Sequence, residues 1–198
     1  MEIYRTESFE IGKLNEFMSE CGENLKVGDV LRFDMTDGPA AAMAVKQEEN
    51  GMIFCFVDCL ADKHRLHKSG RYPGWDDCEL RGVLNEEILN RFPAELHEYM
   101  VPFDNGDLLR IPTEMEMFGE NEYGEEEEGV EQFEPMKDRR NRIANKGYKT
   151  DRWAWYWLQN RSVPSATWAA CVSWDGDADR WDASTVLAVR PLFKIRNL

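Results

Sequence analysis

Positive charge is scarce in this 198-residue sequence, in which 24 lysine and arginine residues stand against 38 aspartate and glutamate residues. The net charge of -14 repels phosphate backbones and anionic lipid surfaces. Long uncharged apolar runs of the kind that cross a bilayer are missing, and so is the basic, then apolar, start of a signal peptide. We therefore expect a cytoplasmic protein whose partners are neither nucleic acids nor membranes.

Cysteine and histidine are also few. The five cysteines are an odd number and lie mostly in apolar runs, which predicts reduced thiols rather than a disulfide framework. Cys55, Cys59, His64 and His67 are close enough in sequence to suggest zinc, but Cys55 lies within an apolar strand pattern, and buried thiols are the simpler interpretation. Motifs for serine hydrolases, zinc proteases and phosphate loops are absent. The sequence assigns no catalytic residue, no cofactor and no metal ion.

Alternating apolar residues predict strands near the start of the chain. Leu31, Phe33 and Met35 share one face of a strand, and the residues between them share the other. Glu49, Asn50 and Gly51 form the expected turn between two apolar runs. Asparagine followed by glycine predicts a hairpin, because both residue types tolerate positive φ.

Helical spacing is found in the middle of the chain. Residues 76–92 repeat apolar side chains at intervals of three and four, and Asp76 and Glu79 have the spacing of a capping box. A proline then predicts a break followed by a second short helical turn. Thr113 and Glu116 have capping-box spacing again, which predicts another helix start.

The composition changes sharply after this region. Residues 114–134 contain ten glutamates and no lysine or arginine, whereas residues 137–152 contain seven basic residues. One interpretation is a solvated insertion whose two halves neutralise each other. The alternative is a functional arm whose basic half contacts a partner. We expect a single domain over residues 1–198, with this charged insertion at residues 119–150.

Six of the seven tryptophans lie between residues 152 and 181. Alternation with smaller apolar residues assigns four of them mainly to the core: Trp153, Trp155, Trp157 and Trp168. Trp174 and Trp181 flank an acidic turn, so we expect both to be partly exposed. A last strand pattern places four apolar side chains on one side: Leu187, Val189, Phe193 and Ile195. Pro191 interrupts it and predicts an edge or a bulge, since proline has no N–H for a ladder.

The acidic turn itself carries carboxylates at alternate positions, Asp175, Asp177 and Asp179, as a calcium loop does at its start. Counted from Asp175, the sixth and twelfth places hold Arg180 and Val186 instead of the glycine and glutamate that such a loop needs. A polar hairpin tip is the simpler interpretation, and a non-standard metal turn remains the alternative.

Several segments resemble a known family in the same order along the chain. The stretch WDDCELRGVLNEEILNRF is similar to the W-x-x-S-x-L-R-x-W-L-N-x-x-F-L helix of an uncharacterised bacterial and prophage family, the domain of unknown function numbered six-two-seven-three. Arg81, Leu84 and Asn85 match that motif, and IPTEMEMFG, WYWLQNRS and VLAVRPLFKI resemble later elements. The resemblance implies a C-type-lectin-like α+β fold of small twisted antiparallel sheets with two main helices, to which the long charged insertion is added.

Three motif residues are candidates for a structural role. Arg81 and Asn85 lie one helical turn apart, so both could fasten the helix to carbonyls or carboxylates of the terminal sheet. Arg190 lies opposite the apolar side of the last strand and could serve the same purpose.

The function expected from these features is that of a non-enzymatic module that binds a protein or a small-molecule ligand; the sequence assigns no oligomeric state. The candidate binding residues are Trp168, Trp174, Asp175, Asp177, Asp179, Arg180, Trp181 and Asp182. Two alternatives stay open: a metal-assisted enzyme that uses the carboxylates between Asp175 and Asp182, and an interaction protein of a mobile element that acts through its glutamate- and arginine-rich arm.

Overall fold

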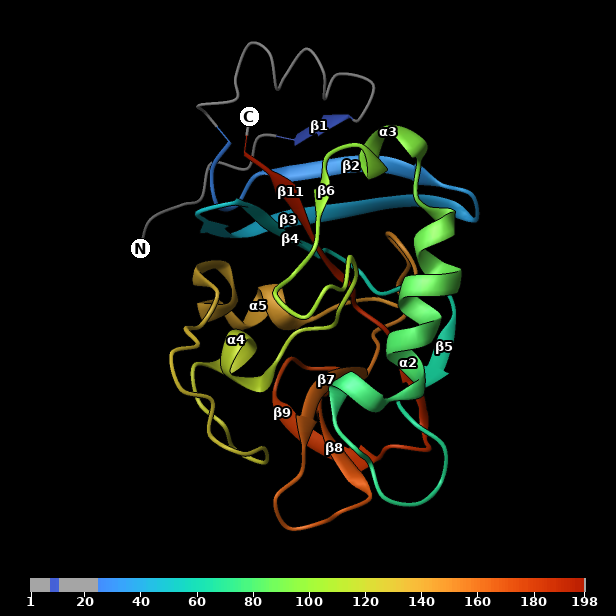
Figure 1. Cartoon of the computed structure of the whole chain (residues 1–198), viewed down its shortest axis with the longest axis vertical. Helices are drawn as coiled ribbons and strands as arrows, with labels where there is room; N and C mark the ends of the chain where they lie inside the picture. The colour runs from blue at the N-terminus through green and yellow to red at the C-terminus, as the bar shows by residue number, and fades with distance from the viewer. Residues whose placement is uncertain (1–7, 11–24, 198) are drawn as a thin grey trace.

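Two β-sheets form the framework of the chain, whose computed structural model describes residues 8–10 and 25–197 (Figure 1). The first sheet has six strands in the order β1-β2-β3-β4-β11-β6. These strands are β1 (Ser8–Glu10), β2 (Val30–Met35), β3 (Gly38–Glu48), β4 (Gly51–Phe56), β11 (Leu192–Arg196) and β6 (Met100–Val101). Its neighbouring strands are antiparallel except β1 and β2, which are parallel.

The second sheet has five strands in the order β5-β10-β7-β8-β9, of which β7, β8 and β9 lie toward the other end of the long axis (Figure 1). These strands are β5 (Lys63–Arg65), β10 (Val186–Ala188), β7 (Tyr156–Arg161), β8 (Trp168–Val172) and β9 (Ala178–Asp182). The short pairing of β10 with β7 is parallel, and the other pairings are antiparallel. Two curled, mainly antiparallel sheets with a few short helices confirm the predicted α+β class.

One helical segment spans several turns and runs beside both sheets (Figure 1). It begins with α2 (Glu79–Gly82), continues as a π-helical stretch at Val83–Ile88 and ends in a 3-10 turn at Leu89–Arg91. The remaining helices are single turns: α3 (Ala94–His97), α4 (Glu114–Phe118), α5 (Arg139–Arg142), and 3-10 turns at Trp75–Asp77 and Glu134–Lys137. The expectation of two main helices is wrong for the described residues, where one helical segment alone spans several turns. None of these helices is long and apolar enough to cross a membrane.

The two predicted capping boxes have different outcomes. At α4, the Thr113 side chain accepts a hydrogen bond from the Glu116 N–H at 3.2 Å, and Glu116 accepts from the Thr113 N–H at 2.9 Å, so this box is confirmed. The box predicted from Asp76 and Glu79 is wrong. A 3-10 turn contains Asp76, so the helix starts one turn later, and the Glu79 carboxylate binds Arg65 at 2.7 Å instead.

The β3-β4 hairpin is present, but the reason for its glycine differs from the prediction. Glu48 pairs with Gly51, so the loop consists of Glu49 and Asn50, and neither has positive φ. A Cβ atom on Gly51 would lie 2.3 Å from the Ile195 carbonyl oxygen. Glycine is therefore required here because β11 approaches β4 closely, not because the turn needs a left-handed residue.

Two clusters of buried side chains lie on either side of the first sheet. In the first core, Leu31, Phe33 and Met35 are buried as predicted and pack with a group of stacked and edge-on phenylalanines: Phe54, Phe56, Phe92 and Phe193. In the second core, the other face of β3 and β4 packs against inward residues of the second sheet: Tyr156, Leu158, Ala170 and Val172. The two sheets are thus joined through the second core.

The last strand pattern is divided between the two sheets. Residues 186–188 form β10 in the second sheet and residues 192–196 form β11 in the first, with Pro191 between them. The Pro191 carbonyl accepts the Phe56 N–H at 3.0 Å. The predicted apolar side is confirmed, since all four of its residues contact the first core: Leu187, Val189, Phe193 and Ile195.

The charged segment at residues 119–150 is partly embedded in the second core. Phe133 and Met136 are almost completely buried there, and each such burial contributes about 2 kcal/mol. Of the ion pairs in the described part of the chain, one joins the acidic half to the basic half, between Glu134 and Lys137. Mutual neutralisation of the two halves therefore does not describe this segment, because apolar anchors hold it to the body.

A buried carboxylate also fixes the glutamate-rich loop. Glu114 accepts hydrogen bonds from the N–H groups of Glu122, Tyr123 and Gly124 at 3.1, 3.0 and 2.7 Å. A Cβ on Gly124 would lie 2.6 Å from the Asn160 Cβ, so only glycine lets the loop approach this closely. Burial raises the pKa of Glu114 above its ordinary value, against the opposing effect of these N–H groups.

Candidate functional site

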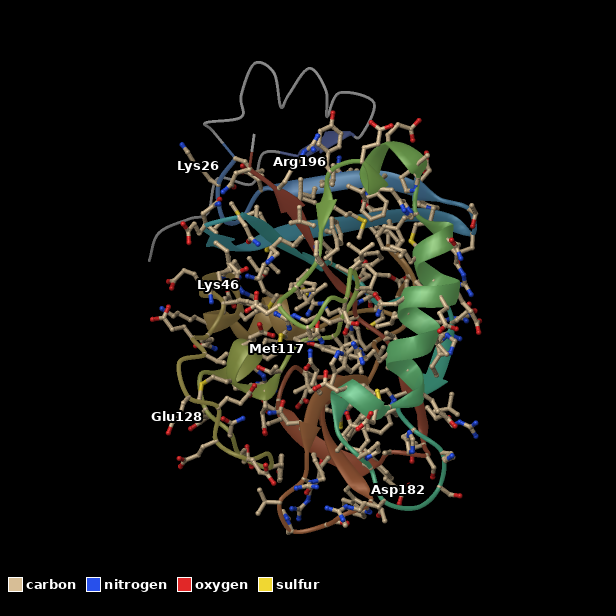
Figure 2. All side chains as sticks on the ribbon, in the orientation of Figure 1. Lys26, Lys46, Met117, Glu128, Asp182 and Arg196 are labelled. Carbon is tan, nitrogen blue, oxygen red and sulfur yellow. The ribbon has the colours of Figure 1, made fainter. Side chains whose placement is uncertain are left out.

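The eight residues predicted to bind a ligand do not form one surface. Strand pleating places Trp168, Arg180 and Asp182 on the face of β8 and β9 that carries the second core, and places Asp179 and Trp181 on the opposite face. The remaining three form the turn between the strands: Trp174, Asp175 and Asp177. Asp182 ends β9 at the end of the molecule that is remote from the first sheet (Figure 2). The turn is therefore one candidate site, and the two strand faces are separate from it.

The turn is held against α5 by an arginine. Arg139 donates to the Asp175 carbonyl oxygen at 2.9 Å and to the carboxylates of Asp175 and Asp177 at 3.0 and 2.9 Å. Gly176 has φ 86°, and a Cβ there would lie 3.0 Å from the Arg139 carbonyl oxygen. The hydroxyl of Ser173 donates to the Asp175 carboxylate and lowers the pKa of that group. The turn is thus a fixed structure whose aspartate carboxylates are bound by Arg139 and Ser173 of the same chain.

This arrangement bears on the metal-turn alternative. The Arg139 guanidinium lies between the carboxylates of Asp175 and Asp177, where a bound cation would have to lie. Asp179 belongs to the strand and points to one side of the sheet. Within residues 8–10 and 25–197, no group of three His, Cys, Asp or Glu side chains is arranged to hold a metal ion. The geometry gives the metal-assisted hypothesis no support.

Two tryptophans form the exposed surface of the tip. The rings of Trp153 and Trp174 stack with centroids 5.5 Å apart and an angle of 14° between their planes. Trp153 is 65% exposed and Trp174 is 47% exposed. The prediction of a core position for Trp153 is wrong, because β7 begins only at Tyr156 and Trp153 pairs instead with residue 145. In that pairing the small Ala154 side chain is buried and the indole points outward.

The other tryptophans have separate environments. Trp157 is buried as predicted and donates to the His64 carbonyl oxygen at 2.9 Å. Trp155 is half-buried and meets Trp181 edge-on at 5.8 Å. Partial exposure is confirmed for both Trp174 and Trp181. The alternation along the sequence therefore separates inward from outward positions only where a regular strand exists.

Trp168 was expected in the core and is instead 37% exposed. It lies at the first position of β8, and the four residues that follow it in the strand are buried. The Arg180 guanidinium lies 5.8 Å from the Trp168 ring and 4.9 Å from the Tyr123 ring. This aromatic contact with a cation joins β9 to the glutamate-rich loop.

The helix residues of the family motif contact a loop and not the terminal sheet. Arg81 donates to both oxygens of the Asp107 carboxylate at 2.8 and 2.9 Å, and the Trp75 indole donates to the same group at 3.0 Å. Asn85 accepts the N–H groups of Leu108 and Leu109, each at 3.0 Å, and donates to the Leu109 carbonyl oxygen at 2.8 Å. The prediction that these side chains contact the terminal sheet is wrong. They bind residues 107–109, a loop that lies beside the helix.

Arg190 lies in the interior and is 3% exposed. It donates to the carbonyl oxygens of Phe56, Val57 and Asn141 at 2.7, 3.0 and 2.9 Å, and to the Tyr156 hydroxyl at 3.1 Å. One guanidinium therefore binds β4, α5 and β7 at the junction of the two sheets. All three motif residues make protein contacts that hold elements in place.

Three cavities lie away from the tip. One of about 220 Å³ lies beside the β2-β3 hairpin, one of about 360 Å³ is lined by Trp75 and Glu125 to Glu127, and one of about 230 Å³ is lined by Phe103, Arg110 and Lys194. Neither Trp153 nor Trp174 lines any of the three.

The sequence did not single out two residues of the tip, Trp153 and Arg139. The signal available for Arg139 was charge complementarity, since a basic segment follows the acidic one in a chain that also carries an aspartate-rich turn. No comparable signal existed for Trp153, whose position depends on pairing with residue 145.

Comparison with known proteins gives one family match. Residues 50–197 match the family model described as a domain of unknown function, DUF6273. Searches of curated proteins and of solved structures found no match.

Proposed function

Since the chain belongs to the DUF6273 family, whose description assigns no activity, we propose from geometry that it is a non-enzymatic binding module whose partner is a protein. The contact surface that we propose is the tryptophan tip, defined as Trp153, Trp174, Asp175, Asp177 and Arg139. The observation that carries the proposal is the stacked and exposed Trp153-Trp174 pair.

The two exposed tryptophan rings offer a large apolar area, and covering it would contribute substantial free energy to binding. Their exposed fractions correspond to roughly 200 Å² of aromatic surface in total, because a tryptophan buries about 200 Å² when fully covered. Covering that area would contribute about 5 kcal/mol of gross hydrophobic free energy. Tryptophan and arginine are also the residue types most enriched among residues that dominate protein interfaces.

The polar groups around the rings favour a protein over a sugar. A sugar needs free donors and acceptors beside the ring on which it stacks. Here Arg139, Asp175 and Asp177 bind one another, so the tip offers mainly apolar ring surface. Small ligands prefer concave sites, and neither Trp153 nor Trp174 lines one of the cavities described above. A protein partner fits a raised aromatic surface with a neutralised rim.

The tip also unites two of the earlier hypotheses. Arg139 comes from the basic half of the charged segment, so the arm and the aspartate turn contribute to the same surface. The proposal includes a C-type-lectin-like architecture, in which the C-terminal region displays the ligand surface, and a bacterial or prophage setting; the family resemblance supports both. A cytoplasmic location is part of it too, supported by the four described cysteines, which are free buried thiols; Cys21 lies outside the described residues.

Site-specific photocrosslinking tests this proposal. A benzophenone amino acid in place of Arg152, the exposed residue beside Trp153, should capture one defined protein from host cells, whereas the same group in place of the exposed Val163 should not. With that partner purified, Trp153→Ala and Trp174→Ala should each weaken binding about 30-fold, as expected for a dominant interface residue. Folded variants that bind the captured partner with unchanged affinity would refute the proposal.

A further inference from the structure

A cavity of about 220 Å³ lies between the β2-β3 hairpin and the loop at residues 147–150. These two segments are more than a hundred positions apart in the sequence, and the cavity shares no residue with the tryptophan tip. Its walls are mainly apolar and are formed by Met35, Pro39, Ala41, Phe56, Leu60 and Tyr148. The volume is smaller than the roughly 300–1,000 Å³ of sites for drug-sized ligands, so a ligand here must be small.

The charged groups that line this cavity all have one sign. Asp37 and Asp58 line it, and no lysine, arginine or histidine of the described chain does so. Asp37 pairs with Arg91 at 2.8 Å outside the cavity wall. Burial raises the pKa of the Cys59 thiol, which also lines the cavity, so it stays neutral. The chemistry of the lining is therefore that of an apolar chamber with two carboxylates.

Asp58 is the more buried of these carboxylates, at 9% exposure. Its Oδ1 accepts the backbone and side-chain N–H groups of Asn145 at 3.0 and 3.1 Å, and its Oδ2 accepts the Lys149 N–H at 3.0 Å. In the part of the chain that the structure describes, no cationic side chain pairs with Asp58. A carboxylate oxygen can accept two hydrogen bonds, so Oδ2 retains the capacity for a second donor.

The loop that closes the cavity has an unusual backbone. Lys149 has φ 54°, the single positive φ among the described non-glycine residues, and such a conformation costs on the order of 1–3 kcal/mol. The hydrogen bond from its N–H to Asp58 and the bond from the Thr150 hydroxyl to the Lys146 carbonyl oxygen, at 2.7 Å, hold the loop in place. Strain of this kind is typical of segments that clamp a ligand.

We propose that this cavity binds a small organic cation, a primary ammonium group on a short apolar body. The ammonium group donates to the acceptor position of Asp58 Oδ2 that the Lys149 N–H leaves open, and the body packs against Met35, Phe56 and Leu60. An anion is excluded by the two carboxylates, and a neutral apolar ligand leaves Asp58 without its second donor. The net charge of -14 also raises the local concentration of cations.

Three four-carbon probes test the proposal on the full chain: n-butylammonium, 1-butanol and butyrate, each titrated by protein-observed NMR. We expect n-butylammonium to bind saturably and at least tenfold more tightly than 1-butanol, and butyrate not to bind. Absence of saturable n-butylammonium binding, or equal binding of the ammonium and the alcohol, would overturn the proposal.

Two variants locate the binding. Asp58→Asn removes the charge and also replaces one accepting oxygen with an amide group that cannot accept an N–H, so the matched variant is Ala41→Leu, which fills the cavity without altering Asp58. Each variant should weaken n-butylammonium binding at least tenfold. Asp104→Asn changes an exposed aspartate elsewhere and should have no effect. Unchanged binding in folded Ala41→Leu protein would overturn the proposal. The Trp174→Ala variant should bind n-butylammonium like the wild type, so the cavity proposal and the proposal for the tryptophan tip can fail independently of each other.

Discussion

Replacement of Asn85 by alanine should destabilise the chain strongly, because this side chain satisfies the backbone of a neighbouring loop. Its amide group makes three hydrogen bonds to the backbone of Leu108 and Leu109. At about 1 kcal/mol for each bond, the variant should lose about 3 kcal/mol of unfolding free energy. For a chain of this size that loss lowers the melting temperature by roughly 6–12 °C. Leu109 is fully buried, so water cannot easily replace the lost partner.

Asn90→Ala is the matched control. Asn90 lies in the same helical segment, is exposed, and makes one hydrogen bond, to the Glu86 carbonyl oxygen within the helix. Its replacement should change the unfolding free energy by no more than about 0.5 kcal/mol. Urea unfolding followed by tryptophan fluorescence measures both variants. Equal losses in the two would refute the view that Asn85 fastens the helix to the loop.

Three further predictions concern single residues. Gly51→Ala should lower the unfolding free energy by about 2 kcal/mol or more, because the new Cβ would lie 2.3 Å from the Ile195 carbonyl oxygen. Gly82→Ala, in a helical turn with open space, should raise it by about 0.5–1 kcal/mol. Urea titration measures both variants, and changes of the same sign would contradict the geometry. Burial raises the folded-state pKa of Glu114 above its ordinary 4.5, so its contribution to stability is present below that pH and is lost as the pH rises through the folded-state pKa. The wild type should therefore lose stability relative to Glu114→Gln as the pH rises above 4.5, and a difference that does not change with pH would count against this assignment. Burial also raises the pKa of Cys78 to about 11, so peptide mapping should find it unmodified by iodoacetamide in the native chain, and rapid native alkylation would show that it is accessible.

Local sequence patterns predicted the elements whose residues contact their neighbours in a regular way. Leu31, Phe33 and Met35 alternate along a strand that covers the first core, so the two-residue periodicity of apolar side chains was sufficient to predict that strand. The capping box of Thr113 and Glu116 is a contact between residues three apart, which a sequence records directly.

Non-local contacts decided the features that the patterns missed. Trp153 continues the alternation of Trp155 and Trp157, but it pairs with residue 145 and its ring is left outside the core. The last apolar pattern looks like one strand, yet Pro191 lies where the chain passes from one sheet to the other. Such outcomes depend on which distant segment pairs with the strand, and one sequence does not contain that information.

The candidate sites show the same division. The sequence identified the aspartate turn and its exposed Trp174, because turn residues and flanking aromatics are local signals. It could not show that Arg139 neutralises the turn, or that Asp58 lines a cavity closed by residues 147–150, since both contacts join segments far apart in the chain.

Hydrogen-deuterium exchange of the chain, alone and with its crosslinked partner protein, tests the central claim most directly. Slower exchange in the complex is predicted for the turn at residues 173–177 and for the adjoining residues 139–142 and 152–154. The loop at residues 147–150 should be unchanged. Protection confined to other surfaces, such as the face that carries Trp168 and Arg180, would contradict the assignment of binding to the tryptophan tip.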